Sequence, residues 1–205
     1  MTRIVVLDYG SGNIHSVVSA LSNTGAEVVL SADPRIAAAA DGLVVPGVGA
    51  FAACMEQLRA VDADQIITER IAAGGPVLGI CVGHQILFSQ GVEHGVPTPG
   101  LGVYPGVVAQ LTTPRVPHMG WNEVSPNPQS QFFTVARRYY FVHSYAALNR
   151  SDCPVDAAVA WTNHDGVDLV AAVEHGPVVS TQFHPEKSGS VGLGFLRSWV
   201  RSVRS

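Results

Sequence analysis

The sequence predicts one α/β domain over residues 1–205, with an open, mostly parallel central sheet flanked by helices and an antiparallel β-rich C-terminal part. Three observations support this prediction. Strands and helices alternate in the first half, short strand-like runs separated by turn residues fill the second half, and 205 residues suit one sizeable domain. No repeat, linker or low-complexity segment divides the chain.

Strand-like runs punctuate the first half of the chain at 3–7, 27–31, 42–45 and 76–80. The first run is apolar throughout, which is typical of a strand covered on both faces of a parallel sheet. Helices are expected at 14–21 with Gly25 as a stop, from Asp33-Pro34, in about two segments reaching Ala73, and at 81–89. Helical crossovers between the strands make the predicted sheet parallel.

The second half is β-rich, with strands expected at 106–111, 138–142, 157–161, 169–174 and 177–183. Residues 163–166 (Asn-His-Asp-Gly) and 174–176 (Glu-His-Gly) predict turns between antiparallel strands. An amphipathic helix at about 191–200 closes the chain.

Composition excludes several classes of protein. Apolar residues make up 47% and charged residues 14%, a globular balance with an ample core. The net charge of −4, without a Lys/Arg block, argues against nucleic acid, and the apolar stretches are too short for a membrane span. Three scattered cysteines predict a reducing compartment, the cytoplasm. We expect no metal and no cofactor, because no His-Glu-x-x-His motif or cysteine cluster is present.

Residues 79–83, Gly-Ile-Cys-Val-Gly, fit the pattern G-x-S-x-G with cysteine in the nucleophile position. They follow a predicted strand and precede a predicted helix, as that pattern requires. The sharp turn strains the backbone at Cys81, the flanking glycines leave room for it, and the helix N-terminus favours a thiolate. The alternative is a cysteine that packs at a strand end as a small apolar side chain.

A thiolate nucleophile needs a base, and the base needs a group that orients it. His184 ends an apolar strand, and Pro185 keeps the backbone extended through it. Because residues i and i+2 of an extended chain point the same way, Glu186 can reach the imidazole of His184. The sequence thus predicts a triad of Cys81, His184 and Glu186. A structural histidine is the alternative for His184, and a metal ligand is disfavoured because no ligand motif accompanies it.

The loop 46–49, Pro-Gly-Val-Gly, follows the third predicted strand. Enzymes with such an elbow usually build the oxyanion hole from the amide after the nucleophile and one amide from this loop. Val82 would supply the first N–H, and Val48 or Gly49 the second. A tight turn without catalytic duty is the alternative.

These segments together resemble the class I (triad) glutamine amidotransferase family, which has a flavodoxin-like fold. Further stretches resemble, within it, the glutaminase subunits of imidazole glycerol phosphate synthase, of histidine biosynthesis. They are 9–14 (Tyr-Gly-Ser-Gly-Asn-Ile), 117–122 (Pro-His-Met-Gly-Trp-Asn), 140–145 (Tyr-Phe-Val-His-Ser-Tyr) and 182–189 (Gln-Phe-His-Pro-Glu-Lys-Ser-Gly). The similarity covers essentially the whole chain, and 118–122 is its most specific part.

The resemblance implies that Cys81 attacks the side-chain carboxamide of glutamine with the help of His184, giving ammonia and a thioester that water hydrolyses to glutamate. It implies a glutamine pocket at Gly49, Gln85, His143, Ser144 and Tyr145. Ammonia would pass to a (β/α)8-barrel cyclase subunit, which forms imidazole glycerol phosphate and an aminoimidazole carboxamide ribotide. Family members are nearly silent until the cyclase binds its nucleotide. The residues that match interface positions are Asn13, Met119, Trp121, Asn122, Tyr140 and Lys187.

The chain departs from the family at residues 83–85, where Gly-His-Gln replaces the usual Gly-Met-Gln. His84 is not assigned as the base, because it lies on the helix that leaves the elbow and the triad is already supplied. Trp121 and Tyr140 could also be ordinary core aromatics. Cys54 is expected to pack in the core, and Cys153 has no evident partner.

Three other functions stay open from the sequence. The chain could serve another synthase, for example in pyridoxal phosphate synthesis, although such a donor should lack the stretch 118–122. It could be an inactive scaffold on the same fold, which a lost triad residue would have favoured. It could also be a cysteine hydrolase or peptidase that needs no cyclase partner.

Overall fold

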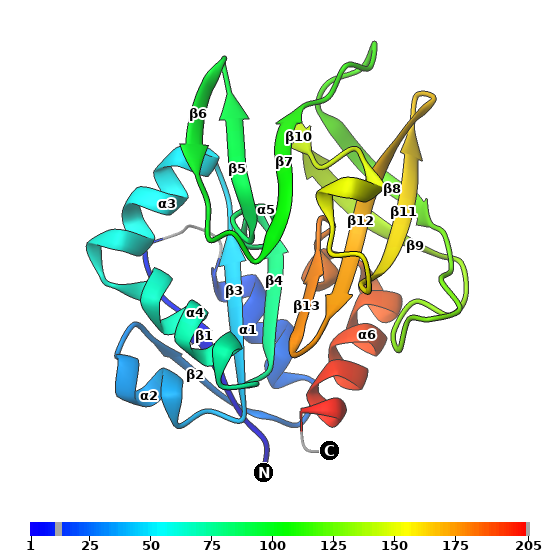
Figure 1. Cartoon of the computed structure of the whole chain (residues 1–205). Coiled ribbons are helices and arrows are strands. Elements are labelled where there is room, and N and C mark those ends of the chain that lie inside the picture. Colours follow the sequence, from blue (N-terminus) through cyan, green and yellow to red (C-terminus); the bar gives the residue numbers. More distant parts are fainter. Residues whose placement is uncertain (11–13, 204–205) are drawn as a thin grey trace.

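The central sheet of the computed structural model has seven strands in the order β11-β12-β13-β4-β3-β1-β2 (Figure 1). The structure describes residues 1–10 and 14–203. The seven strands are β1 (Arg3–Leu7), β2 (Glu27–Ser31), β3 (Gly42–Gly47), β4 (Val77–Cys81), β11 (Ala158–His164), β12 (Val167–His175) and β13 (Val178–Thr181). From β2 to β13 all neighbours are parallel, and β12 and β11 continue the sheet in antiparallel fashion. The predicted open, mostly parallel sheet with an antiparallel part is confirmed.

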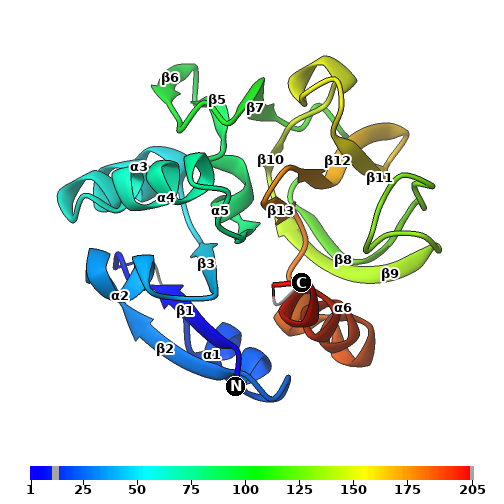
Figure 2. The same cartoon turned by 60° about the horizontal axis from the view of Figure 1, so that its bottom comes forward.

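Helices cover both faces of this sheet, with α1 and α6 on one side and α2, α3 and α4 on the other (Figures 1 and 2). Their bounds are α1 (Ile14–Ser22), α2 (Pro34–Ala38), α3 (Phe51–Ala60), α4 (Ala63–Ala72), α5 (Val82–Gln85) and α6 (Gly189–Ser202), with 3₁₀ turns η1 (Arg150–Asp152) and η2 (Pro185–Lys187). Helix α2 begins where Asp33-Pro34 predicts, because the Asp33 side chain accepts the Arg35 N–H at 2.8 Å. Gly25 follows α1 with φ of 87°, as expected of a stop residue.

Two smaller sheets lie beside the main one. The first has the order β10-β7-β5-β6, formed by β5 (Phe88–Glu93), β6 (Val96–Pro99), β7 (Tyr104–Gln110) and β10 (Tyr145–Ala146). The second pairs β8 (His118–Val124) with β9 (Arg137–His143) in antiparallel register. Strands β5, β6, β8 and β10 were not predicted, since they are short or carry polar residues and form only by pairing with distant strands.

The helix predicted to run from the elbow to about Ser89 is wrong in length. Helix α5 ends at Gln85, and strand β5 begins at Phe88. The carbonyl groups of residues 86 and 87 instead accept the N–H groups of Leu101 and Tyr104. The Phe88 ring then packs edge-on against Tyr104, with ring centroids 5.0 Å apart. Long-range pairing therefore overrides a local apolar run that sequence alone reads as helix.

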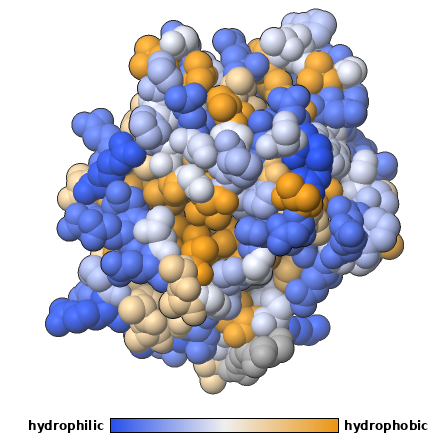
Figure 3. Space-filling model, viewed as in Figure 1, coloured by the Kyte–Doolittle hydropathy of each residue, from blue (hydrophilic) through white to orange (hydrophobic). Residues whose placement is uncertain are grey.

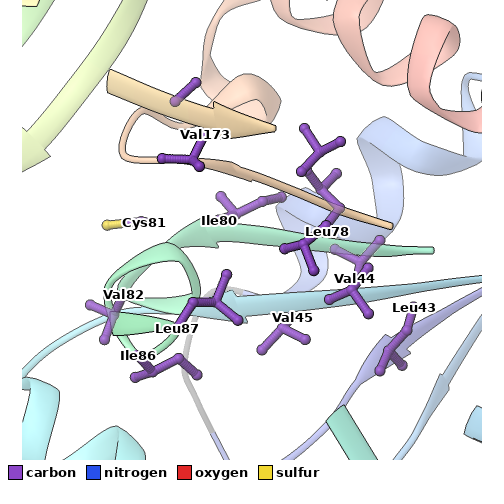
Figure 4. Packing of buried hydrophobic residues seen from close by; sticks show 14 of the residues in the cluster. Leu43, Val44, Val45, Leu78, Ile80, Cys81, Val82, Ile86, Leu87 and Val173 are labelled. Atoms are coloured by element: carbon purple, nitrogen blue, oxygen red, sulfur yellow. The ribbon is translucent and has the colours of Figure 1, made fainter. Parts of the chain in front are cut away.

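A continuous apolar core covers the central strands, and its side chains on β3 and β4 extend along these strands up to the elbow at Cys81 (Figure 4). Leu43, Val44 and Val45 of β3 and Leu78 and Ile80 of β4 are almost fully buried. In register, Gly47 at the end of β3 faces Cys81 at the end of β4. The carboxyl ends of two adjacent parallel strands thus bring the loop 46–49 next to the cysteine, the usual place for a site in such a sheet. In Figure 3, apolar side chains gather in the middle of the face seen in Figure 1, and polar side chains surround them.

Candidate active site

Cys81 occupies a strained turn between strand β4 and helix α5. Its φ of 57° and ψ of −112° are unfavourable for a residue with a side chain. The turn is closed by glycines: a Cβ on Gly83 would lie 1.8 Å from the Val45 carbonyl oxygen, and one on Gly79 would lie 2.6 Å from the Gly83 oxygen. The helix therefore packs directly onto β3 and β4, and the predicted elbow geometry is present at Cys81.

His184 and Glu186 form a buried pair, as their spacing predicts. The imidazole Nδ1–H donates to Glu186 Oε1 at 2.7 Å, and the side chains are 3% and 1% exposed. The other ring nitrogen, Nε2, has no hydrogen-bond partner within residues 1–10 and 14–203. Burial works to lower the pKa of His184, but the nearby Cys81 sulfur and the Glu186 carboxylate outweigh it and raise the pKa to about 9. The site therefore favours an imidazolium beside the cysteine sulfur.

Strand β9 holds the histidine in place through Tyr140. The His184 N–H donates to the Tyr140 carbonyl at 2.9 Å, and the Tyr140 N–H donates to Ser188 Oγ at 2.9 Å. The Ser188 hydroxyl in turn donates to the His184 carbonyl at 2.6 Å. These contacts involve the Tyr140 backbone, so no side-chain pattern in the sequence predicts them.

Two side chains hold the loop 46–49 in place by hydrogen bonds to its carbonyl groups. The Tyr9 hydroxyl donates to the Pro46 carbonyl, and the Cys54 thiol donates to the Val48 carbonyl at 3.3 Å. Because a peptide unit is planar and trans, the N–H of Gly49 points away from Cys54. Burial raises the pKa of Cys54 to about 11, so this cysteine stays a thiol and a donor at neutral pH. Cys54 is buried as predicted, and it also orients this loop.

A cavity of about 230 Å³, the reaction cavity, lies between the elbow, His184 and the loop 46–49. Its lining residues are Val48, Gly49, Cys81, Val82, Gln85, Glu93, Val142, His143, Ser144, Tyr145, His184 and Lys187. The set contains the predicted nucleophile and base, all three predicted oxyanion positions and all five predicted glutamine-binding positions. Segments far apart in sequence therefore converge on one small pocket, with Glu186 behind His184.

Residues 5–199 match the family described as Glutamine amidotransferase class-I. The chain belongs to this family. The fold and the family predicted from the sequence are thus confirmed.

Three relatives of this class-I glutamine amidotransferase carry the name "Imidazole glycerol phosphate synthase subunit HisH". The protein of that name from Mycolicibacterium paratuberculosis is 55% identical over 98% of each chain. Its counterpart from Nocardia farcinica is 55% identical over 99% of this chain and 100% of its own. The Mycobacterium tuberculosis protein is 56% identical over 96% of each chain.

Solved structures of amidotransferases share the fold at low sequence identity. A crystal structure of a glutamine amidotransferase superposes with a TM-score of 0.77 at 19% identity, covering 98% of this chain and 99% of that one. A glutamine amidotransferase from Thermotoga maritima gives a TM-score of 0.68 at 16% identity, covering 100% of this chain and 99% of that one. At such identities the likeness concerns the fold.

The structure places five of the six predicted interface residues of this amidotransferase: Met119, Trp121, Asn122, Tyr140 and Lys187. Met119 is 62% and Trp121 48% exposed, so Trp121 is not a core aromatic. Tyr140 is half-buried and lies edge-on to Trp121, with centroids 6.2 Å apart. Lys187 lines the reaction cavity. Asn13 lies outside the described residues.

Glu93 and Val142 line the cavity but were not predicted. Glu93 ends strand β5, which was not predicted, and its Oε1 accepts the Phe51 N–H at 2.9 Å. No group of three or more His, Cys, Asp or Glu side chains that could hold a metal ion occurs in the part of the chain that the structure describes. Among the described helices, none is long and apolar enough to cross a membrane.

His84 is buried in this amidotransferase rather than presented to the nucleophile. Its Nδ1 lies 2.8 Å from Ser180 Oγ, and its ring packs edge-on to Phe88 with centroids 5.1 Å apart. Burial lowers the pKa of His84 to about 3, so the imidazole is neutral at physiological pH. A buried, neutral His84 held by Ser180 does not act as the base for Cys81, as expected from the sequence.

Proposed function

We propose that the chain is the glutaminase subunit of an imidazole glycerol phosphate synthase, hydrolysing glutamine to glutamate and ammonia through Cys81, His184 and Glu186. The observation that carries the proposal is the shared cavity of Cys81, on its strained elbow, and His184, oriented by Glu186. Relatives that are 55% and 56% identical to this chain over nearly the full length support the choice of synthase.

The chemistry follows from the two groups beside the His184 imidazole, the Cys81 sulfur and the Glu186 carboxylate. The thiolate of Cys81 attacks the carboxamide carbon of glutamine, and the imidazolium gives its Nε2 proton to the departing nitrogen, which leaves as ammonia. The glutamyl group is then held as a thioester. Water loses a proton to the neutral Nε2 and attacks the thioester, releasing glutamate and regenerating Cys81. Glu186 holds the Nδ1–H tautomer throughout and stabilises the cation.

The negative charge on the carboxamide oxygen needs donors that are fixed in advance. The Val82 N–H is the first amide of the one-turn helix α5, where N–H groups have no partner within the helix, and it would be one such donor. The loop N–H of Val48 or Gly49 would complete the oxyanion hole. Removing one such donor typically costs about 3 kcal/mol in the transition state. The hydrogen bond from Cys54 sets the orientation of the Val48–Gly49 peptide.

The cavity also suits the charged end of glutamine. Glu93 and Lys187 both line it, so the pocket offers a carboxylate for the α-ammonium group and an ammonium for the α-carboxylate. Gly49, Gln85, His143, Ser144 and Tyr145 would surround the remaining atoms. The Gln85 Nε2 donates to the Tyr145 carbonyl at 2.8 Å and to Gln182 Oε1 at 3.0 Å, which holds this wall in place.

The product ammonia would be passed to a (β/α)8-barrel cyclase subunit in the cytoplasm, where imidazole glycerol phosphate and the aminoimidazole carboxamide ribotide form. The exposed Met119 and Trp121 support a docking role for strand β8. We therefore expect Trp121→Ala to weaken binding of the cyclase or its stimulation of the glutaminase at least about tenfold, while the urea midpoint changes little. Equal affinity and equal stimulation in the variant would remove Trp121 from the interface.

The decisive test replaces the nucleophile. Cys81→Ala should abolish glutamine hydrolysis, yet its complex with the cyclase should still turn over with added ammonia, because only the ammonia source is lost. Cys153→Ala, which removes a buried cysteine outside the cavity lining, is the matched control and should keep both activities. Retained glutaminase activity in Cys81→Ala would overturn the assignment. Stimulation of the wild type by a different synthase, or hydrolysis of peptides instead of glutamine, would replace it.

A further inference from the structure

A row of hydrogen-bonded side chains connects the reaction cavity with a second cavity on the protein surface. The surface cavity measures about 350 Å³, and His118 and Asn122 are among its lining residues. Asn122 Nδ2 lies 3.2 Å from His118 Nε2, and His118 Nδ1 lies 3.0 Å from His143 Nε2. His143 belongs to the lining of the reaction cavity. The row therefore crosses the β8–β9 pair from one cavity to the other.

Only one arrangement of protons satisfies this row, and the Asn122 amide defines its outer end. The Glu123 N–H, which can only donate, bonds to Asn122 Oδ1 at 2.9 Å. The Asn163 carbonyl, which can only accept, takes a hydrogen bond from Asn122 Nδ2 at 2.7 Å. Both contacts fix the same orientation of the amide, so Asn122 must donate its second hydrogen to His118 Nε2. The remaining proton of His118 then lies on Nδ1 and is donated to His143 Nε2.

The inner end independently requires the same direction. His143 Nδ1 lies 3.0 Å from the Tyr145 carbonyl, which can only accept, so Nδ1 carries the proton. Burial lowers the pKa of His143 to about 3 and that of His118 to about 4, so both rings are neutral at pH 7. Two neutral rings with their protons on Nδ1 fit the row from both ends, and the opposite tautomers fit neither end.

We propose that Asn122 and His118 are positioning residues for the glutaminase site: through His143 they hold the backbone carbonyl of Tyr145, a residue that lines the pocket. The inference rests on the proposed function, because it assigns the row a role in binding glutamine. The Tyr145 carbonyl receives hydrogen bonds from both His143 and Gln85, so its direction depends on the row. The outer end lies on the same strand as the exposed Met119 and Trp121.

The test reverses the outer end without changing its shape. Asn122→Asp replaces the donating amide by a carboxylate that can only accept, so a neutral His118 must present an Nε2–H to it. Its Nδ1 then becomes an acceptor, His143 must donate from Nε2, and the His143 Nδ1 lone pair faces the Tyr145 carbonyl. The new carboxylate also raises the pKa of His118, so the ¹⁵N shifts are used to read the charge of this ring as well as its tautomer. Asn122→Ala is the control that removes the donor without adding a charge. The tautomers of both histidines are read by ¹⁵N NMR at pH 7, and glutamine hydrolysis is measured in complex with the cyclase.

We expect Nδ1–H tautomers for both rings in the wild type and Nε2–H for His118 in Asn122→Asp. KM for glutamine should rise about tenfold in Asn122→Asp and less in Asn122→Ala, with a smaller change in kcat, because the triad is not part of the row. Nε2–H tautomers in the wild type would overturn the proton arrangement. An unchanged KM in Asn122→Asp would overturn the positioning role. Glutamine hydrolysis by the wild-type complex distinguishes failure of the positioning role from failure of the proposed function. A wild-type complex that hydrolyses no glutamine would refute the proposed function.

Discussion

Replacing His84 by methionine should make the protein markedly less sensitive to acid. In the unfolded chain this imidazole titrates near pH 6.5, whereas burial lowers its pKa to about 3 in the folded protein. Between these values the unfolded chain binds one more proton than the native protein. The free energy of unfolding therefore falls as the pH falls below 6.5, by about 1.4 kcal/mol per pH unit for this group.

At pH 5 the loss attributable to His84 amounts to about 2 kcal/mol relative to neutral pH. The full slope applies over this interval, because the interval from pH 6.5 to pH 5 lies wholly above the folded pKa of about 3. The pKa of His184 is raised to about 9 instead, so its contribution is complete below pH 6.5 and is lost as the pH rises through 9. The two effects act on opposite sides of pH 6.5 and do not mask each other.

Urea unfolding at pH 7 and pH 5, followed by circular dichroism, measures the effect. The difference in unfolding free energy between His84→Met and the wild type should shift by about 2 kcal/mol in favour of the variant on going to pH 5. Phe88→Leu, which loosens the packing around His84 but keeps the imidazole, should give the same difference at both pH values. An unchanged difference for His84→Met would mean that the native imidazole binds its proton as readily as the imidazole of the unfolded chain, and the reasoning would fail.

Two further substitutions test the elbow and the pocket. Gly83→Ala should destabilise the protein by about 3 kcal/mol or more, because its Cβ would lie 1.8 Å from the Val45 carbonyl oxygen. Gly194→Ala is the control and should not destabilise the protein, because no atom lies within 4 Å of its Cβ. Equal urea midpoints for the two variants would contradict the close packing of the elbow. Glu93→Gln should raise KM for glutamine about tenfold with little change in kcat, because the partner of the α-ammonium is weakened; an unchanged KM would show that Glu93 does not contact the substrate.

The sequence predicts those parts of the fold whose signals are local. Gly25 and Asp33 mark helix boundaries at the right positions, and the parallel strands follow from apolar runs between helices. The elbow around Cys81 is equally local, because its strand, turn and glycines are contiguous in the chain. The reach of Glu186 to His184 needs only two residues of extended backbone.

The sequence does not predict features that depend on pairing between distant segments. Strand β8 carries polar and exposed residues, and it exists because it pairs with β9. Glu93 lines the pocket at the end of β5, a strand that pairs with β6 and β7. The contact between His118 and His143 joins residues that are 25 positions apart on two strands, and no periodicity of the sequence predicts it. The thiol of Cys54 bonding to Val48 is a matter of side-chain direction, which sequence patterns do not specify.

Direct observation of the acyl-enzyme tests the central claim. The wild-type complex with the cyclase and its nucleotide is mixed with glutamine, quenched in acid during turnover, digested and examined by mass spectrometry. We predict a glutamyl group on the peptide that contains Cys81, absent from the Cys81→Ala protein. Turnover without any adduct at Cys81, or an adduct at Cys54 or Cys153 instead, would contradict the proposed chemistry.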